Sequence, residues 1–365
     1  MAELAPATKG GRFRSYDGVQ ALRFVAAMLV VVTHSTLYAS ERLADGGPEV
    51  WDFGAIGVEI FFVISGFVMI VSTIKLVGTA SGWREFGIRR VIRIYPMYWL
   101  ATTVKLVIAI AIPAAVLHSV LTPGYVAYSY LLIPTYAADG EVTPLLNVGW
   151  TLMYEMFFYI LFMIALLFRV KPFIYVGAVL SLFALGSAFR PESGFSPLLI
   201  FFDPIVLYFL LGMAIGQFVL SRRFIILALT VAWVLFLKVA TGLITGQFDI
   251  WQTRSSMVTL VGVFLVMLLV ISCEPWLHGR VPNLLLYFGA ASYVLYLFHP
   301  LVAPLAPLAL AKLHVHSAVL SILGSISIAL IAAAVIYSFV EKPLTRRLNA
   351  KFLRRNQAPQ PTVTA

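Results

Sequence analysis

Charged side chains are scarce in this sequence. Aspartate, glutamate, lysine and arginine make up 12% of the 365 residues, about half the share that a soluble domain carries. Hydrophobic residues make up 61%, and the mean hydropathy is +0.94. This balance excludes a soluble globular protein, because only a short head, one loop near residues 119–147 and a short tail are not apolar. The sequence therefore predicts an all-α polytopic membrane protein.

Cysteine is almost absent as well. Cys273 is the only one, which excludes an internal disulfide and a pair of thiols. The formal net charge is +10, but the positions of the basic residues explain it better than a nucleic-acid partner would, so no nucleic-acid partner is expected. The partner that the composition predicts is the membrane.

Ten apolar segments are long enough to cross a bilayer, which takes about 20 residues. They begin near residues 19, 54, 94, 148, 172, 198, 223, 256, 284 and 317. Pro300, Pro304 and Pro307 are expected to break or end the helix in the ninth segment. The first segment ends at Leu37-Tyr38-Ala39, which resembles a signal-peptidase site, but its internal charges and the nine later spans favour an uncleaved anchor.

The distribution of lysine and arginine predicts the orientation. With a cytoplasmic N-terminus, 20 of the 26 basic residues fall in cytoplasmic segments. The exceptions are Arg42, Arg190, Arg254 and Lys312 outside, and Lys105 and Lys238 within spans. An odd number of spans would expose the basic tail, so we expect about ten helices with both termini cytoplasmic. Residues 1–15 then form a cytoplasmic head, 16–345 the membrane domain and 346–365 a basic, disordered tail.

Two ionisable residues lie in the first apolar run. Arg23 and His34 are eleven positions apart, so on a helix they share one stripe, three turns or roughly 16 Å from each other. Ionisable groups inside a span are costly and usually mark a pathway or a site. The pair places a permanent cation near the cytoplasmic face and a titratable base toward the other face.

Three further titratable residues are predicted in the outer half of the membrane. Glu59 comes early in the second span, Glu155 early in the fourth and His299 late in the ninth. Two imidazoles and two carboxylates at similar depth favour a general-base arrangement, in which a carboxylate such as Glu155 orients His34. Glu59 and His299 are candidate supporting groups.

An arginine cluster opens the third segment. Arg89, Arg90 and Arg93 lie at the depth of Arg23, and the spacing places Arg89 and Arg93 on one helix face. Guanidinium forks match the geometry of phosphate oxygens. The pattern indicates a cytoplasmic phosphate-binding site connected to an extracytoplasmic proton-transfer site.

Structural roles explain several of these residues equally well. Arg89 and Arg90 could serve only to set the topology. His299 could hydrogen bond a backbone carbonyl beside Pro300. Glu59 could form an ion pair with Lys105 or Lys238. Further structural roles are a helix stop at residues 341–343 and interface anchoring by Trp83, Trp99 and Trp150.

Six segments together resemble the family 3 membrane acyltransferases, and within them the exopolysaccharide O-acetyltransferase type. They are residues 19–35 with the Arg-x10-His pattern, 57–67, 89–99, 149–159, 292–300 and 341–343. The resemblance implies about ten transmembrane helices in a bacterial inner membrane. It implies catalytic roles for Arg23, His34 and Glu155, and a role in binding the co-substrate for the arginines near 89–93.

The resemblance implies an enzyme that transfers an acyl group from cytoplasmic acyl-CoA, by default acetyl-CoA, to a hydroxyl of an extracytoplasmic saccharide. The acceptor is an exopolysaccharide or its lipid-linked glycan precursor, polysaccharide-assembly proteins are potential partners, and no metal is expected. The alternative is a proton-coupled transporter or flippase of a glycolipid or anion, because a buried His/Glu set also suits a proton relay. Dependence on acyl-CoA rather than on a proton gradient separates the two.

Overall fold

The computed structural model describes residues 16–43, 48–111, 121–191, 193–246 and 256–353. Within these ranges the chain is helical, and the one extended pairing is an isolated bridge between Tyr136 and Val142. Ten helical stretches of the described chain are long and apolar enough to cross a membrane. The predicted all-α, ten-span fold is confirmed.

The long helices follow the predicted apolar segments. They are α1 (Asp17–Arg42), α2 (Gly57–Thr73), α3 (Gly82–Ala111), α5 (Trp150–Leu167), α6 (Pro172–Gly186), α7 (Leu207–Ser221), α8 (Phe224–Thr245), α9 (Met257–Leu277), α11 (Ser292–Val302) followed by α12 (Leu305–Lys312), and α13 (Ala318–Ile336). Shorter helices are α4 (Pro123–Leu131), α10 (Asn283–Ala290) and α14 (Lys342–Phe352). Short 3-10 turns precede α2, α5 and α7, and a π-helical turn at Tyr337–Glu341 joins α13 to α14.

Three boundaries differ from the prediction. The third span begins at Gly82 rather than near 94, because the basic residues before 94 continue the helix and Pro96 is accommodated inside it. The sixth begins at Pro204 rather than near 198, because Pro197–Phe201 forms a separate 3-10 turn and Pro204 starts the turn that leads into α7. The segment from 284 forms three helices, with a break at Ala303–Pro304 and with Pro300 inside α11.

The chain after residue 345 was expected to be disordered. Instead, α14 extends to Phe352, so the first part of this tail is helical. Pro343 lies in the first turn of α14, directly after the π-helical turn. The predicted head, 1–15, and residues 354–365 lie outside the described residues.

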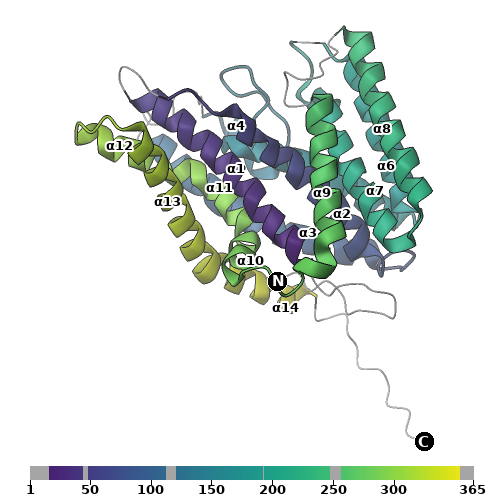
Figure 1. Cartoon of the computed structure of the whole chain (residues 1–365). Coiled ribbons are helices and arrows are strands. Elements are labelled where there is room, and N and C mark those ends of the chain that lie inside the picture. Colours follow the sequence, from purple (N-terminus) through teal and green to yellow (C-terminus); the bar gives the residue numbers. More distant parts are fainter. Residues whose placement is uncertain (1–15, 44–47, 112–120, 192, 247–255, 354–365) are drawn as a thin grey trace, which may run out of the picture.

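Helix α1 runs through the middle of the bundle. It contacts α2, α9, α10, α11 and α13, and Figure 1 shows it between α13 on one side and α9 on the other. We call the two ends of the bundle the Asp17 end and the Arg42 end, after the first and last residues of α1. The start of α1 and helix α14 lie at the same end in Figure 1, as an even number of crossings requires.

A carboxylate of α9 caps the start of α1. Glu274 accepts hydrogen bonds from the backbone N–H groups of Asp17 and Gly18, with N···O distances of 2.5 and 3.0 Å. The Asp17 carboxylate in turn accepts from the Gly279 N–H at 2.9 Å and contacts His278 Nδ1 at 3.2 Å. The N–H groups at a helix start have no intrahelical acceptor, so the Glu274 carboxylate satisfies two of them and fixes where α1 begins. The Asp17 contacts tie the same helix start to the residues after α9.

Helices α2 and α7 pack with their backbones in close contact. A Cβ atom on Gly66 would lie 2.1 Å from the Phe209 carbonyl oxygen, and one on Gly212 would lie 1.9 Å from that of Val63. Small residues allow this approach, which is a common way for helices to associate in membranes. The pair fixes α2, which forms one wall of the site described next.

Candidate active site

Two adjacent pockets of the described chain contain most of the predicted site residues. The first, which we call the arginine cavity, is lined by Arg23, Arg90, Arg93, Glu155 and Tyr159 among others. The second, the histidine pocket, is lined by Thr33, His34, Asn147 and Trp150 among others. Val58 and Tyr296 line both pockets. The two sites that the sequence predicts at different depths are therefore adjacent and share a wall.

Arg90 and Arg93 enter the arginine cavity from α3. They are three residues apart, so they project from the same side of the helix. Arg93 Nη1 lies 2.5 Å from Glu341 Oε1, and its guanidinium lies 5.0 Å from the centre of the Tyr293 ring. The guanidinium of Arg90 lies 5.3 Å from the centre of the Tyr159 ring. Aromatic faces and a carboxylate thus hold both guanidinium groups at the cavity wall.

Arg89 does not enter the cavity. Its Nη2 atom pairs with Glu85 Oε1 at 2.7 Å, and the side chain is 51% exposed. The predicted shared face of Arg89 and Arg93 therefore does not bring Arg89 into the cavity, although Arg93 lines it. Arg89 was expected to bind the co-substrate with Arg90 and Arg93, but the structure brings only the latter two together with Arg23.

Glu155 belongs to the arginine cavity. It accepts a hydrogen bond from Ser65 Oγ of α2 at 3.2 Å and another from the Tyr159 hydroxyl. Arg23 lies within electrostatic range of Glu155, Glu341 and Arg93. The sequence predicts Glu155 as the group that orients His34, whereas the structure places these two residues in different pockets.

Glu341 is a site residue that the sequence analysis interprets only as part of a helix stop. Its side chain is 3% exposed, and it reaches Arg93 from the π-helical turn that ends the last span. Such turns are frequent at functional sites because they redirect side chains. The cavity thus gathers three arginines and two carboxylates, which leaves an excess of positive charge available to an anion.

His34 is oriented by its own helix. Its Nδ1 atom lies 3.0 Å from the carbonyl oxygen of Val30, and a carbonyl can only accept a hydrogen bond, so neutral His34 carries its proton on Nδ1. The Nε2 atom then keeps its lone pair. His34 also lines the histidine pocket, which gives the protein a base with a fixed tautomer beside open space.

His299 lies next to His34. The centres of the two rings are 4.9 Å apart, so the predicted convergence of the first and ninth spans is observed. His299 is 1% exposed and directs Nδ1 toward the Leu295 carbonyl oxygen at 3.2 Å. Its Nε2 atom has no hydrogen-bond partner among the described residues. This position fits both roles predicted for His299, as a supporting group beside His34 and as a residue that hydrogen bonds a backbone carbonyl.

Glu59 lies elsewhere. Its side chain is 1% exposed and lies within electrostatic range of the Tyr208 hydroxyl on α7. It lines neither pocket. The first turn of α2 therefore contributes Val58, and not Glu59, to the wall shared by the two pockets.

Two tryptophans predicted as interface anchors differ in position. Trp99 is 47% exposed and donates its indole N–H to the Tyr130 carbonyl oxygen at 3.0 Å. Trp150 instead lines the histidine pocket at the first residue of α5. The sequence does not distinguish them, because both lie near the end of an apolar segment.

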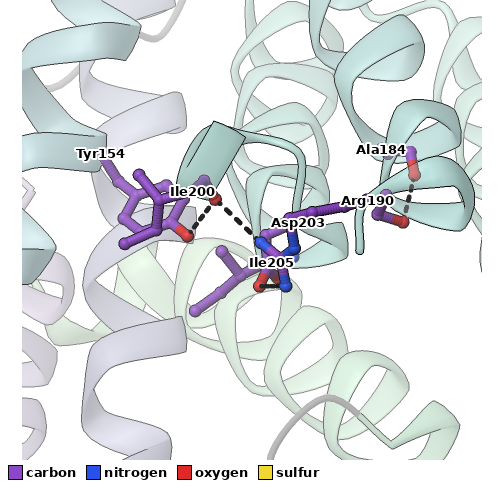
Figure 2. A network of polar contacts seen from close by, with 7 residues as sticks. Tyr154, Ala184, Arg190, Ile200, Asp203 and Ile205 are labelled. Carbon is purple, nitrogen blue, oxygen red and sulfur yellow. Dashed lines mark hydrogen bonds and ion pairs between the residues drawn. The ribbon is translucent and has the colours of Figure 1, made fainter. Parts of the chain in front are cut away.

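A polar network supports the N-terminal part of α5 at the Arg42 end. Tyr154 donates its hydroxyl to the Ile200 carbonyl oxygen at 2.6 Å, and Arg190 donates to the same oxygen at 3.3 Å. Arg190 also pairs with Asp203 at 3.6 Å, and Asp203 caps the turn at Ile205. Figure 2 shows this arrangement between α5 and the connection from α6 to α7. It fixes the start of the helix that carries Trp150 and Glu155.

The family model for the acyltransferase domain matches residues 16–340. The chain belongs to this acyltransferase family. The match includes every residue that lines the two pockets and ends one residue before Glu341, and the ten membrane-crossing stretches make the chain a multi-pass membrane acyltransferase.

Two curated relatives extend the comparison. The exopolysaccharide production protein ExoZ of Rhizobium meliloti is 33% identical over 307 residues, which are 82% of this chain and 92% of ExoZ. YrhL of Bacillus subtilis, whose name proposes a peptidoglycan O-acetyltransferase, is 24% identical over 94% of this chain, which spans 57% of that relative. No solved structure matches the chain.

Proposed function

We propose that this acyltransferase moves an acyl group, by default acetyl, from acyl-CoA to a hydroxyl of an extracytoplasmic saccharide. The observation that carries the proposal is the junction of two pockets at Val58 and Tyr296, one rich in arginine and the other containing an oriented histidine. The names of ExoZ and YrhL support a polysaccharide acceptor and O-acetyl transfer.

In this proposal the arginine cavity binds the donor. Coenzyme A carries several phosphate charges on its nucleotide part, and Arg23, Arg90 and Arg93 supply the matching cations. The phosphates then take the place of Glu341 as the partner of Arg93. The extended pantetheine arm then passes Val58 and Tyr296 and presents the thioester to the histidine pocket.

His34 acts as the general base. Its Nε2 atom takes the proton from the acceptor hydroxyl while the hydroxyl oxygen attacks the thioester carbonyl carbon. The new C–O bond forms, the C–S bond breaks, and the sulfur leaves as a thiolate that receives the proton from His34. The Val30 carbonyl holds the reactive tautomer throughout. Glu155 then acts within the arginine cavity, where it balances charge around Arg23.

The two pockets also suggest how the reaction crosses the membrane. The basic residues favour a cytoplasmic Asp17 end in a bacterial inner membrane, with the acceptor glycan or its lipid-linked precursor reaching His34 from the Arg42 end. Proteins of polysaccharide assembly would supply that acceptor.

Membrane vesicles test the donor and the sidedness together. Inverted vesicles are loaded with saccharide fragments and given labelled acetyl-CoA outside, and right-side-out vesicles receive the same treatment. We expect label in the enclosed saccharide of inverted vesicles only. Movement of a glycolipid or anion that needs a proton gradient and no acetyl-CoA, without any transfer of label, would instead support the transporter alternative.

A further inference from the structure

The turn that leads into α5 forms part of the histidine pocket. Asn147 opens the 3-10 turn Asn147–Gly149, and Trp150 follows it as the first residue of α5. Both line the pocket together with His34, and the Asn147 side chain is exposed.

Contacts on both sides hold this turn in place. The Tyr296 hydroxyl of α11 donates to the Val148 carbonyl oxygen at 3.1 Å and lies 2.8 Å from Thr151 Oγ1. On the other side, the Leu145 N–H donates to Ser129 Oγ of α4 at 2.9 Å. Asn147 and Trp150 are thereby held beside His34 by residues from two other helices, which is the rigidity that a binding site requires.

Close packing beneath the turn adds to this rigidity. A Cβ atom on Gly149 would lie 2.8 Å from the Pro144 side chain and 3.1 Å from the Tyr98 ring. Tyr98 is fully buried and donates its hydroxyl to the Ser129 carbonyl oxygen at 2.7 Å. The backbone of the turn therefore cannot move toward α3, and its side chains remain directed to the pocket.

The two side chains offer complementary chemistry. The Asn147 amide provides two N–H donors and a carbonyl acceptor, and the Trp150 indole provides a flat apolar face with one N–H donor. Neither group hydrogen bonds another residue of the described chain. A pyranose ring has apolar C–H faces and an edge of hydroxyl groups, so it can pack on the indole while its hydroxyls meet the amide.

We infer that Asn147 and Trp150 form the acceptor subsite of the histidine pocket, and that its ligand is a pyranose unit of the glycan. The indole packs against the sugar face, and the amide binds a hydroxyl next to the one that His34 deprotonates. The subsite thus selects the hydroxyl that is acylated. This inference rests on the proposed function, because it assigns the acceptor of that reaction.

The test uses purified full-length protein in lipid nanodiscs. The acceptor probe is oligosaccharide from the Rhizobium meliloti exopolysaccharide, stripped of its ester groups with mild base, and the donor is labelled acetyl-CoA. The variants are Asn147→Ala, Trp150→Ala and Trp150→Phe. Trp99→Phe is the matched control, because Trp99 lies on α3 away from both pockets. Acceptor KM and acetyl-CoA Kd are measured separately for each protein.

Loss of one polar or stacking contact should raise the acceptor KM by about tenfold in Asn147→Ala and Trp150→Ala. Trp150→Phe should recover part of this loss because it keeps an aromatic face, and the acetyl-CoA Kd should stay within about twofold in every variant. A structural role alone would not separate these two constants.

Two results would overturn the inference in different ways. In the first, the wild-type protein is active. If both alanine variants then keep the wild-type acceptor KM, or if they lose acetyl-CoA binding as much as acceptor binding, the subsite is rejected and the proposed function stays intact. Wild-type protein that binds acetyl-CoA but acetylates none of these oligosaccharides would reject this exopolysaccharide as the acceptor, and the subsite as a site for its sugars.

Discussion

Arg89 and Arg93 lie one turn apart on α3, yet their surroundings differ. Arg93 lines the arginine cavity beside Glu341, whereas Arg89 pairs with Glu85 at the surface. Replacement of Arg93 by alanine should weaken acetyl-CoA binding by about tenfold or more, because a hydrogen bond to a charged group contributes roughly 1.5–3 kcal/mol. Arg93→Lys should bind at an intermediate strength, since it keeps a charge near Glu341 but loses the planar fork.

Arg89→Ala is the control for this prediction. Its exposed ion pair contributes little, so the dissociation constant for acetyl-CoA, measured by equilibrium binding to purified protein, should match that of wild type. Equal weakening in the Arg89 and Arg93 variants would show that the arginines act only through overall charge, and not through the cavity.

At the scale of residues, the sequence predicts how deep a side chain lies in the membrane better than it predicts which neighbour the side chain faces. The stripe of Arg23 and His34 and the proximity of His299 follow from span limits and helical periodicity. Depth alone does not say which neighbour a side chain faces, so Glu155 is assigned to His34 although it lies in the arginine cavity. The contact of Glu341 with Arg93 depends on a π-helical turn and on residues 248 positions apart, which no local pattern encodes.

At the scale of elements, the α2–α7 contact should be sensitive to a single methyl group. In Gly212→Ala the new Cβ would meet the Val63 carbonyl oxygen at 1.9 Å, so the two backbones must separate. Overpacking of this kind costs about 1–3 kcal/mol, and we expect a melting temperature several degrees lower in detergent, measured by fluorescence-detected unfolding.

Gly262→Ala is the matched control. Gly262 lies within α9, and nothing stands within 4 Å of the position that its Cβ would take. Alanine at such a helical position normally stabilises slightly, so the melting temperature should stay the same or rise. Equal destabilisation in both variants would contradict the close-packing explanation.

The sequence predicts where the ten crossings lie but not where each helix begins. Apolar length alone locates the ten crossings, because a bilayer sets a minimum span. It does not locate the start of α3 at Gly82, where basic residues continue a helix beyond its apolar part. It also does not reveal that the turn before α5 carries pocket residues, because that depends on Tyr296 and Ser129 from distant helices.

At the scale of the whole molecule, the bundle separates two tasks along its length. The arginine cavity is built from α1, α2, α3, α5 and α11. The histidine pocket is built from α1, α11, the turns before α2 and α5, and the first turns of α2 and α5. Helix α1 belongs to both, since it carries Arg23 and His34. Binding of the donor and proton transfer to His34 should therefore be separable by mutation.

The most direct test of this account compares His34→Ala with wild type in two assays on the same purified protein. General-base catalysis contributes about 10²–10⁴-fold, so transfer of labelled acetyl groups to saccharide should fall by at least about 100-fold. Binding of acetyl-CoA should stay within about twofold of wild type. His316→Ala, which alters an exposed histidine, should change neither quantity. Loss of acetyl-CoA binding together with transfer in His34→Ala, or transfer that persists without His34, would contradict the account.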